Sequence, residues 1–283
     1  MANIYQSQTC RLKELNNLFI ELTAKNCNQR CKNCYIDFPL SKNVKDFIDE
    51  NLIKKTLSDT KDENLQCIYL TGAEPMTHPD FNSILRLCLK RTNVCICTNG
   101  SFINEKKARF LKRVEDESEF EIIFQLSLAH YDEIKNDDVR GRGTYRQTLH
   151  AIKSLVKYEF NPIICITDFY AEGKNKILEG LKPICEKIGF IATENNFKIN
   201  TPFNPNINSE YLLGKWESLD CEYGRILTTK GVYTCPFLAN DHRGRSGSDF
   251  NDYSDKSILE TNFCATCIKN QTQMFSINFK NFN

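Results

Sequence analysis

Cys27-Asn-Gln-Arg-Cys31-Lys-Asn-Cys34-Tyr35 is the most informative segment of this chain, because it places three cysteines on one short loop with the spacing C-x3-C-x2-C. Three thiolates on a tight loop can hold three irons of a [4Fe-4S] cube and leave the fourth iron open to a ligand from outside the protein. A zinc site is one alternative, but zinc takes a fourth nearby ligand that this loop does not offer. Plain buried thiols are the other alternative. The spacing therefore favours an iron-sulfur cluster with one reactive corner.

The flanking sequence predicts repeated βα units around a parallel sheet. Short β-branched or aromatic runs alternate with segments of helical period from Leu18 to about Asn200. The predicted strands are 18–22, 67–70, 94–97, 121–128, 163–166 and 197–199, and the predicted helices are 44–57, 81–91, 105–114, 145–158 and 174–188. The fold class is therefore α/β, and the cysteine loop directly follows the first strand.

Three further segments stand directly after predicted strands. They are Thr71-Gly72-Ala73-Glu74-Pro75, then Thr98-Asn99-Gly100, then Ser127 with the later Asp138-Val-Arg140-Gly-Arg-Gly143. Each also has a plainer interpretation, because Glu74 could be a surface acid, Thr-Asn-Gly an ordinary turn and Arg140 a solvated charge. Their shared position favours function, since barrel enzymes build active sites at the carboxyl ends of their strands.

Taken together, these segments resemble the radical S-adenosylmethionine (SAM) superfamily over most of the chain. The resemblance implies a partial (β/α)6 TIM-like barrel in residues 1–200, with Cys27, Cys31 and Cys34 holding a [4Fe-4S] cluster that binds SAM. It also implies that SAM is contacted by Tyr35, Gly72, Glu74, Asn99, Ser127 and Arg140. Glu74 would face the methionyl amino group and Arg140 the carboxylate. Two positions depart from the family pattern, Ala73 from its second glycine and Asn33 from its usual aromatic residue or histidine.

The last 83 residues differ in composition, and a Pro/Asn-rich stretch from Thr201 predicts a second domain at 201–283. A hairpin is predicted from 225–227 and 232–234. The remaining spaced cysteines of this part are Cys221, Cys235, Cys264 and Cys267. Four thiols can hold one [4Fe-4S] cluster or one zinc, and free thiols are the third possibility. The spacing resembles the twitch form of the SPASM extension, which implies an auxiliary [4Fe-4S] cluster in a small C-terminal iron-sulfur domain.

The other cysteines, including Cys10, are expected to be buried apolar residues, although Cys97 and Cys165 could instead return a hydrogen atom to a substrate radical. Asp168 could contact substrate or ribose, or cap a helix. The 283 residues carry 37 basic and 36 acidic side chains, a net charge of +1, which gives no reason to expect a nucleic-acid partner. The absence of a long apolar run and of a secretory signal predicts a cytoplasmic protein with neither membrane spans nor structural disulfides.

Three functions are considered. In the first, the enzyme cleaves SAM reductively to a 5′-deoxyadenosyl radical and abstracts hydrogen from a ribosomal peptide, which is then cross-linked, epimerised or oxidised. The second is oxidation of a small metabolite such as an amino sugar alcohol, favoured by the 17 residues before Leu18, too few for a leader-recognition domain. The third is a non-catalytic metal-binding or redox-sensing protein. We favour the peptide by family analogy, with a one-electron donor such as flavodoxin or ferredoxin as partner.

Overall fold

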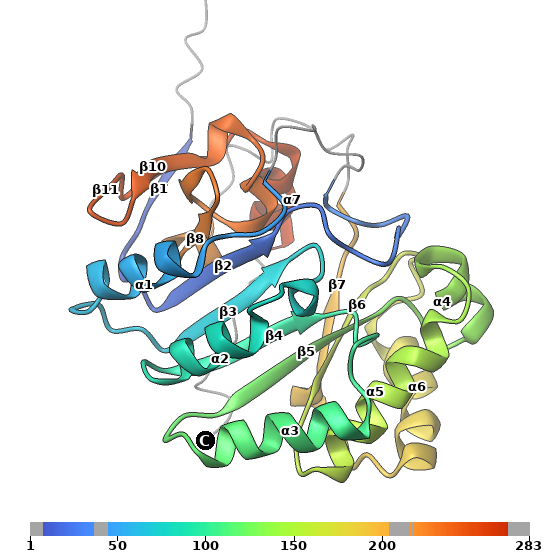
Figure 1. Ribbon diagram of the computed structural model, residues 1–283. Coiled ribbons are helices and arrows are strands. Elements are labelled where there is room, and N and C mark those ends of the chain that lie inside the picture. The colour runs from blue at the N-terminus through green and yellow to red at the C-terminus, as the bar shows by residue number, and fades with distance from the viewer. Residues whose placement is uncertain (1–7, 37–44, 204–215, 217, 271–283) are drawn as a thin grey trace, which may run out of the picture.

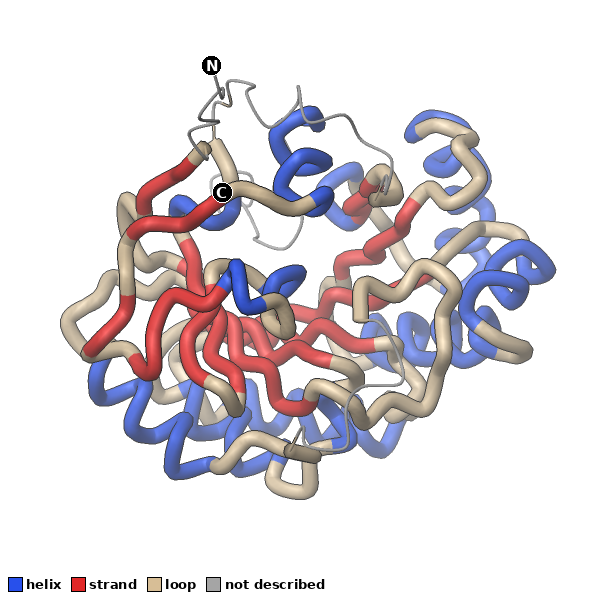
Figure 2. Tube along the Cα trace, turned by 90° about the horizontal axis from the view of Figure 1, so that it is seen from above, coloured by secondary structure: helices blue, strands red, loops and turns tan. Residues whose placement is uncertain are grey.

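The computed structural model describes residues 8–36, 45–203, 216 and 218–270, and a 10-stranded sheet forms its centre. The parallel strands are β2 (Asn17–Thr23), β3 (Cys67–Gly72), β4 (Asn93–Thr98), β5 (Ile122–Leu128), β6 (Ile163–Thr167) and β7 (Phe197–Asn200). Each pairs with the next in chain order. Seen from above, the strands form an arc with helices along its outer side (Figure 2). This is the predicted α/β fold with a partial barrel.

The helices of the βα units lie along the outer side of the sheet (Figure 1), and all but the mostly polar α4 bury an apolar face in the core there. They are α1 (Glu50–Asp59), α2 (Phe81–Leu89), α3 (Glu105–Asp116), α4 (Glu133–Arg140), α5 (Thr144–Lys157) and α6 (Lys174–Ile188). Side chains at Asp49, Asn104 and Asp132 accept hydrogen bonds from the first turns of α1, α3 and α4, which satisfies free N–H groups there. In the described part of the chain, no helix combines the length and apolarity needed to cross a membrane.

Alternate side chains of the strands face two separate layers. On β2, Leu18, Ile20 and Leu22 join the large core under the helices, whereas Phe19 joins a second buried cluster with Tyr69 and Cys95. All seven residues of β2 are buried, as expected for a central parallel strand covered on both faces. The inner face of the arc is therefore available to position functional groups at the strand ends.

The C-terminal part extends the same sheet. The predicted hairpin is confirmed as β8 (Gly224–Thr228) and β9 (Gly231–Tyr233), and β8 pairs in parallel with β2. The sheet ends in β10 (Arg245–Asp249) and β11 (Asp252–Tyr253), while β12 (Lys256–Ile258) pairs with β1 (Thr9–Arg11) before α7 (Asn262–Asn270). The sheet is thus continuous across residue 200, and the division there into two domains stays a prediction.

Several elements differ from those predicted. Helix α1 begins at Glu50, six residues later than expected, and residue 44 lies outside the described residues. Strand β1 and helix α4 were not predicted. Short 3-10 turns also occur at Pro75–Thr77, Glu194–Asn196, Asp220–Glu222, Pro236–Leu238 and His242–Gly244.

Candidate active site

A cavity of about 760 Å³ opens at the carboxyl ends of the parallel strands. Its lining residues from these strand ends are Thr71, Gly72, Ala73, Thr98, Asn99, Ser127, Leu128, Thr167 and Asn200. The cysteine loop lines it as well, and Phe203, Phe237 and Phe263 line it from the C-terminal part. The volume lies within the range of about 300–1,000 Å³ typical of small-molecule sites. The predicted location of the active site therefore coincides with a real cavity.

The three cysteines of the first cluster all line this cavity. The side chain of Cys27 accepts from the backbone N–H of Gln29 at 3.3 Å, and Asn99 Nδ2 lies 3.8 Å from Cys27 Sγ. A turn closes between the N–H of Cys34 and the carbonyl of Cys31 at 3.2 Å. Burial raises the pKa of the Cys27 and Cys34 thiols, so ligation of a metal here would release protons.

The structure does not by itself decide between a cube and a single ion at this loop. Among the residues that the structure describes, no three Cys, His, Asp or Glu side chains are close enough to hold one metal ion. A [4Fe-4S] cube takes each thiolate on a different iron, whereas a tetrahedral zinc gathers its ligands around one ion. The iron-sulfur cluster at this loop stays a prediction from the cysteine spacing.

Gly72 ends β3 with a backbone angle that other residues rarely adopt, φ +116°. A Cβ atom at this position would lie 2.2 Å from the backbone oxygen of Thr23, at the end of the neighbouring strand β2. The same oxygen accepts from the N–H of Ala73 at 2.7 Å. Glycine is therefore required here so that the loop after β3 can lie directly against β2 beside the cavity.

Glu74 has a different position from the one expected. Its side chain is fully buried and accepts from Met76 N at 3.1 Å, Thr98 Oγ1 at 2.8 Å and Asn99 N at 2.9 Å. It is not among the residues that line the cavity. Burial raises the pKa of this carboxyl group, although the three donors act in the opposite direction. The carboxylate thus joins the loops after β3 and β4, and its pairing with a methionyl ammonium group stays a prediction.

Arg140 has unused hydrogen-bonding capacity at the cavity wall. Its Nη2 donates to Gln29 Oε1 at 3.0 Å, and the side chain is 7% exposed. Its Nε and the Nε2 of Gln29 are buried without a hydrogen-bond partner in the described structure. Because such groups are costly to leave unpaired, the pair fits an additional anionic or polar ligand. The role of Arg140 as the clamp for a carboxylate stays a prediction.

The other predicted contact residues also reach the cavity. Asn99 and Ser127 line it directly, and Asn99 Nδ2 donates to Asn28 Oδ1 at 2.9 Å. Tyr35 lines it too, and its ring makes an edge contact with Phe237 at 5.4 Å between centroids. Burial raises the pKa of Tyr35, so the phenol stays protonated and can donate. Tyr35 therefore connects the cysteine loop to the C-terminal part.

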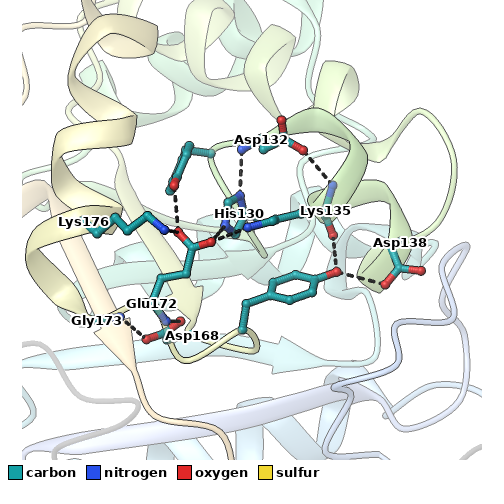
Figure 3. Close-up of polar contacts among 10 residues, drawn as sticks. His130, Asp132, Lys135, Asp138, Asp168, Glu172, Gly173 and Lys176 are labelled. Atoms are coloured by element: carbon teal, nitrogen blue, oxygen red, sulfur yellow. Dashed lines mark hydrogen bonds and ion pairs between the residues drawn. The ribbon is translucent and has the colours of Figure 1, made fainter.

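An ion pair that was not predicted fastens the cysteine loop to α4. Lys32 Nζ lies 2.6 Å from Asp138 Oδ1, and Tyr170 Oη donates to Asp138 Oδ2 at 2.9 Å (Figure 3 shows Asp138). Lys32 and Asp138 belong to two segments that the sequence analysis assigned to the site, so the sequence indicated both residues but not their contact. Tyr170 lies in the loop after β6, and only the tertiary structure reveals its part.

The loop after β6 is held by a second polar network (Figure 3). Glu172 accepts from Tyr131 Oη at 2.7 Å, forms an ion pair with Lys135, and lies 3.3 Å from His130 Nε2. These partners hold the pKa of Glu172 well below its usual range. Asp168 accepts from the backbone N–H groups of Glu172 and Gly173 at 2.9 and 2.8 Å. Asp168 thus holds the turn before α6 without capping the helix, because α6 begins after Gly173 and has no side-chain cap; its contact with substrate or ribose stays a prediction.

Cys97 and Cys165, the two candidate hydrogen donors, both line the cavity. Cys97 Sγ lies 3.6 Å from Gln125 Oε1, and burial raises the pKa of Cys165 to about 12. A thiol rather than a thiolate is the form that can donate a hydrogen atom. Their role in the reaction stays a prediction.

The four spaced cysteines of the C-terminal part come together in one buried cluster. Cys221 and Cys264 are buried, and Cys235 and Cys267 pack against the same cluster. A fifth cysteine, Cys10, joins them, with its Sγ 3.2 Å from Cys221 Sγ. Cys10 is buried, as expected, but its contact with a predicted ligand could not be inferred from spacing, since 211 residues separate the two.

Comparisons with known proteins identify the family. The sequence pattern of the Radical SAM superfamily matches residues 22–179. The antilisterial bacteriocin subtilosin biosynthesis protein AlbA of Bacillus subtilis (strain 168) is 31% identical over 137 residues, which are 48% of this chain and 29% of that protein. This chain therefore aligns with less than a third of that relative.

Solved structures share the fold at low sequence identity. Native anSMEcpe with bound AdoMet matches with a TM-score of 0.63 and 17% identity over 84% of this chain and 79% of that chain. SuiB of Streptococcus suis, bound to the precursor peptide SuiA, matches with a TM-score of 0.60 and 15% identity over 82% of this chain and 62% of that chain. Because the superfamily pattern spans more than half of its residues, the chain belongs to the radical SAM superfamily.

Proposed function

We propose that this enzyme modifies a residue of a ribosomally made peptide by cross-linking, epimerisation or oxidation. The cavity of about 760 Å³ carries the proposal, because the three-cysteine loop and the phenylalanines Phe203, Phe237 and Phe263 line it together. Such a cavity offers a site for SAM and, beside it, an apolar wall for a substrate side chain. The names of two relatives support a peptide, since AlbA serves bacteriocin biosynthesis and SuiB binds a precursor peptide. Membership of an enzyme family argues against the non-catalytic alternative.

Cys27, Cys31 and Cys34 would each hold one iron of a [4Fe-4S] cluster and leave the fourth for SAM. When bound together, cluster and SAM supply a 5′-deoxyadenosyl radical that removes a hydrogen atom from the substrate. Arg140 would bind the methionyl carboxylate through its unpaired Nε. In this proposal Tyr35, Gly72, Asn99 and Ser127 remain SAM contacts.

Other residues would position these SAM-binding groups and exclude water from the cavity. The Glu74 carboxylate holds Thr98 and Asn99 at the cavity wall through its hydrogen bonds. Phe203 packs edge-on against Phe237 at 4.4 Å and Phe263 at 4.5 Å between ring centroids. An aromatic wall of this kind excludes water from a reactive centre and accepts an apolar substrate side chain.

The C-terminal cysteines would hold an auxiliary [4Fe-4S] cluster. Cys221, Cys235, Cys264 and Cys267 share one buried cluster, and no three of the described ligand side chains are close enough for a single ion. Four thiolates complete the ligand set of one cube, and zinc is the alternative that metal analysis separates from it. We include a one-electron donor, such as flavodoxin or ferredoxin, as the external reductant.

Iron analysis tests this assignment. The anaerobically purified chain is expected to bind about eight irons, two cubes. Cys235→Ser should halve that number and leave the first cluster. Four irons together with one zinc in the parent protein would contradict an auxiliary iron-sulfur cluster.

The reaction itself is tested with SAM, dithionite and deuterated substrates. Reconstituted protein should release 5′-deoxyadenosine, and Cys31→Ala should abolish the release. Peptides encoded beside the gene, supplied in deuterated form, are expected to transfer deuterium to 5′-deoxyadenosine. Cys88→Ala is the control, because Cys88 is a fully buried residue of α2, outside the cavity lining. Transfer from a deuterated amino sugar alcohol and from none of the peptides would instead support the metabolite alternative.

A further inference from the structure

Cys10 is held in contact with a proposed ligand of the auxiliary cluster. Strand β1 pairs with β12 so that Cys10 stands opposite Ser257, and Cys10 is 4% exposed. In this position its Sγ lies 3.2 Å from Cys221 Sγ, within hydrogen-bond distance for two sulfurs. Two thiolates so close together cannot each occupy a separate iron of one cube. Cys10 can therefore serve as a partner of the ligand Cys221 and not as an additional ligand beside it.

Arg225 places a positive charge at the same site. Its side chain is fully buried, and its Nη atoms donate to the backbone carbonyls of Cys221, Gly224 and Asp255 at 2.7, 2.8 and 2.7 Å. Its Nε is buried without a hydrogen-bond partner in the described structure. A buried guanidinium bound only to carbonyl oxygens lacks charge compensation, which is costly in a protein interior. Burial lowers the pKa of Arg225. Because its Nη1 is held at the backbone of Cys221, an anionic cluster on the Cys221 thiolate would lie beside this guanidinium and compensate its charge.

We propose that Cys10 and Arg225 form the outer shell of the auxiliary cluster and raise its reduction potential. This inference rests on the auxiliary cluster of the proposed function. Cys10 Sγ–H donates to the Cys221 thiolate, and the Arg225 guanidinium lies beside the same ligand. Reduction adds one negative charge to the cluster, and both a donor and a cation stabilise the more negative state. Both are positioning residues, because neither binds iron.

The test uses the full chain with Cys27, Cys31 and Cys34 replaced by alanine, so that the auxiliary cluster alone contributes iron and an EPR signal. Iron and zinc are counted, and the midpoint potential is measured by an EPR-monitored redox titration. Cys10→Ala should keep about four irons. It should also lower the ratio of reduced to oxidised cluster at a fixed potential about tenfold. This equals a fall of ~59 mV in the midpoint potential of a one-electron couple.

Two matched variants separate this effect from simple loss of packing. Cys10→Ser keeps a donor in the same place and should stay closer to the parent midpoint than Cys10→Ala. Cys88→Ala removes a fully buried thiol elsewhere and should leave the midpoint unchanged. Arg225→Lys should likewise stay closer to the parent than Arg225→Met. Since Arg225→Met also removes three backbone hydrogen bonds, the Cys10 variants decide the outcome if that variant is insoluble.

Each contrary result has a distinct meaning. An unchanged midpoint in Cys10→Ala, with the iron retained, would overturn the outer-shell role and leave the auxiliary cluster intact. Loss of iron in Cys10→Ala would also overturn it, because Cys10 would then be a ligand. A parent protein without iron at this site, or with zinc in its place, would refute the auxiliary cluster itself.

Discussion

Gly72→Ala tests whether the loop after β3 must lie directly against β2. The new methyl group would start 2.2 Å from the Thr23 carbonyl oxygen, a backbone atom that cannot rotate away. A non-glycine residue at such an angle costs about 1–3 kcal/mol. Displacement of the loop would also weaken the hydrogen bond from Ala73 N to Thr23 O, worth about 0.5–1.5 kcal/mol. We therefore expect Gly72→Ala to lower the free energy of unfolding by about 2–4 kcal/mol.

Gly189→Ala is the matched control. Gly189 also has a positive angle, φ +77°, but a Cβ there meets no atom within 4 Å. Only the backbone preference is lost, about 1–2 kcal/mol. Gly189 follows α6 and does not line the cavity, so its substitution should leave SAM cleavage unchanged.

Urea unfolding and 5′-deoxyadenosine release, both measured without oxygen, provide the assay. A shift of about 1 Å at a reaction site can reduce the rate about 100-fold, so Gly72→Ala should lose most of its SAM cleavage. Equal losses of stability in the two alanine variants, together with unchanged cleavage in Gly72→Ala, would refute the close-approach argument.

Three further predictions follow from single side chains. Burial raises the pKa of Glu21 from 4.5 to about 7, so the folded protein binds this proton more tightly and loses about 3 kcal/mol of stability as pH rises from about 4.5 to 7. Glu21→Gln should remove that part of the pH dependence in urea unfolding; an unchanged slope would contradict the raised pKa. Arg140→Lys should weaken SAM binding about tenfold in equilibrium dialysis, because lysine lacks the planar guanidinium that binds a carboxylate through two N–H groups. Substitution of the exposed Arg142 by lysine should leave SAM binding unchanged. Equal effects of the two substitutions would exclude a specific carboxylate contact by Arg140. Tyr170→Phe removes the hydrogen bond to Asp138 and should cost about 0.5–1.5 kcal/mol of unfolding free energy, whereas no loss would show that the bond contributes nothing net.

The parallel sheet could be predicted because strands β2 to β6 are mostly buried and rich in apolar residues, whereas the half-buried β7 gave a weaker pattern. Strand β1 could not, because it has three residues and its partner β12 lies about 245 positions later in the chain. Helix α4, with the sequence EIKNDDVR, is mostly polar and buries only Asn136, Val139 and Arg140. Its helical character therefore comes from capping by Asp132 and from tertiary contacts, which a periodicity argument does not detect.

The candidate site was predictable where local spacing determines it. The three-cysteine loop and Arg140 reach one cavity because parallel strands end at a common edge. The direction of a side chain at that edge is a tertiary property, so the burial of Glu74 away from the cavity could not be inferred from its motif. The same holds for Cys10, since its contact with Cys221 joins positions 211 residues apart, whereas Arg225 reaches Cys221 locally, four residues along the chain.

The most direct test asks whether SAM binds the iron that the loop Cys27–Cys34 leaves free. Anaerobic protein in which Cys221, Cys235, Cys264 and Cys267 are replaced by alanine retains only the first cluster in this account. After reduction, SAM labelled with nitrogen-15 in its amino group should show hyperfine coupling to the cluster in electron-nuclear double resonance. A cube without this coupling, with its fourth iron bound by a protein side chain, would contradict the account, as would the absence of any cube at this loop.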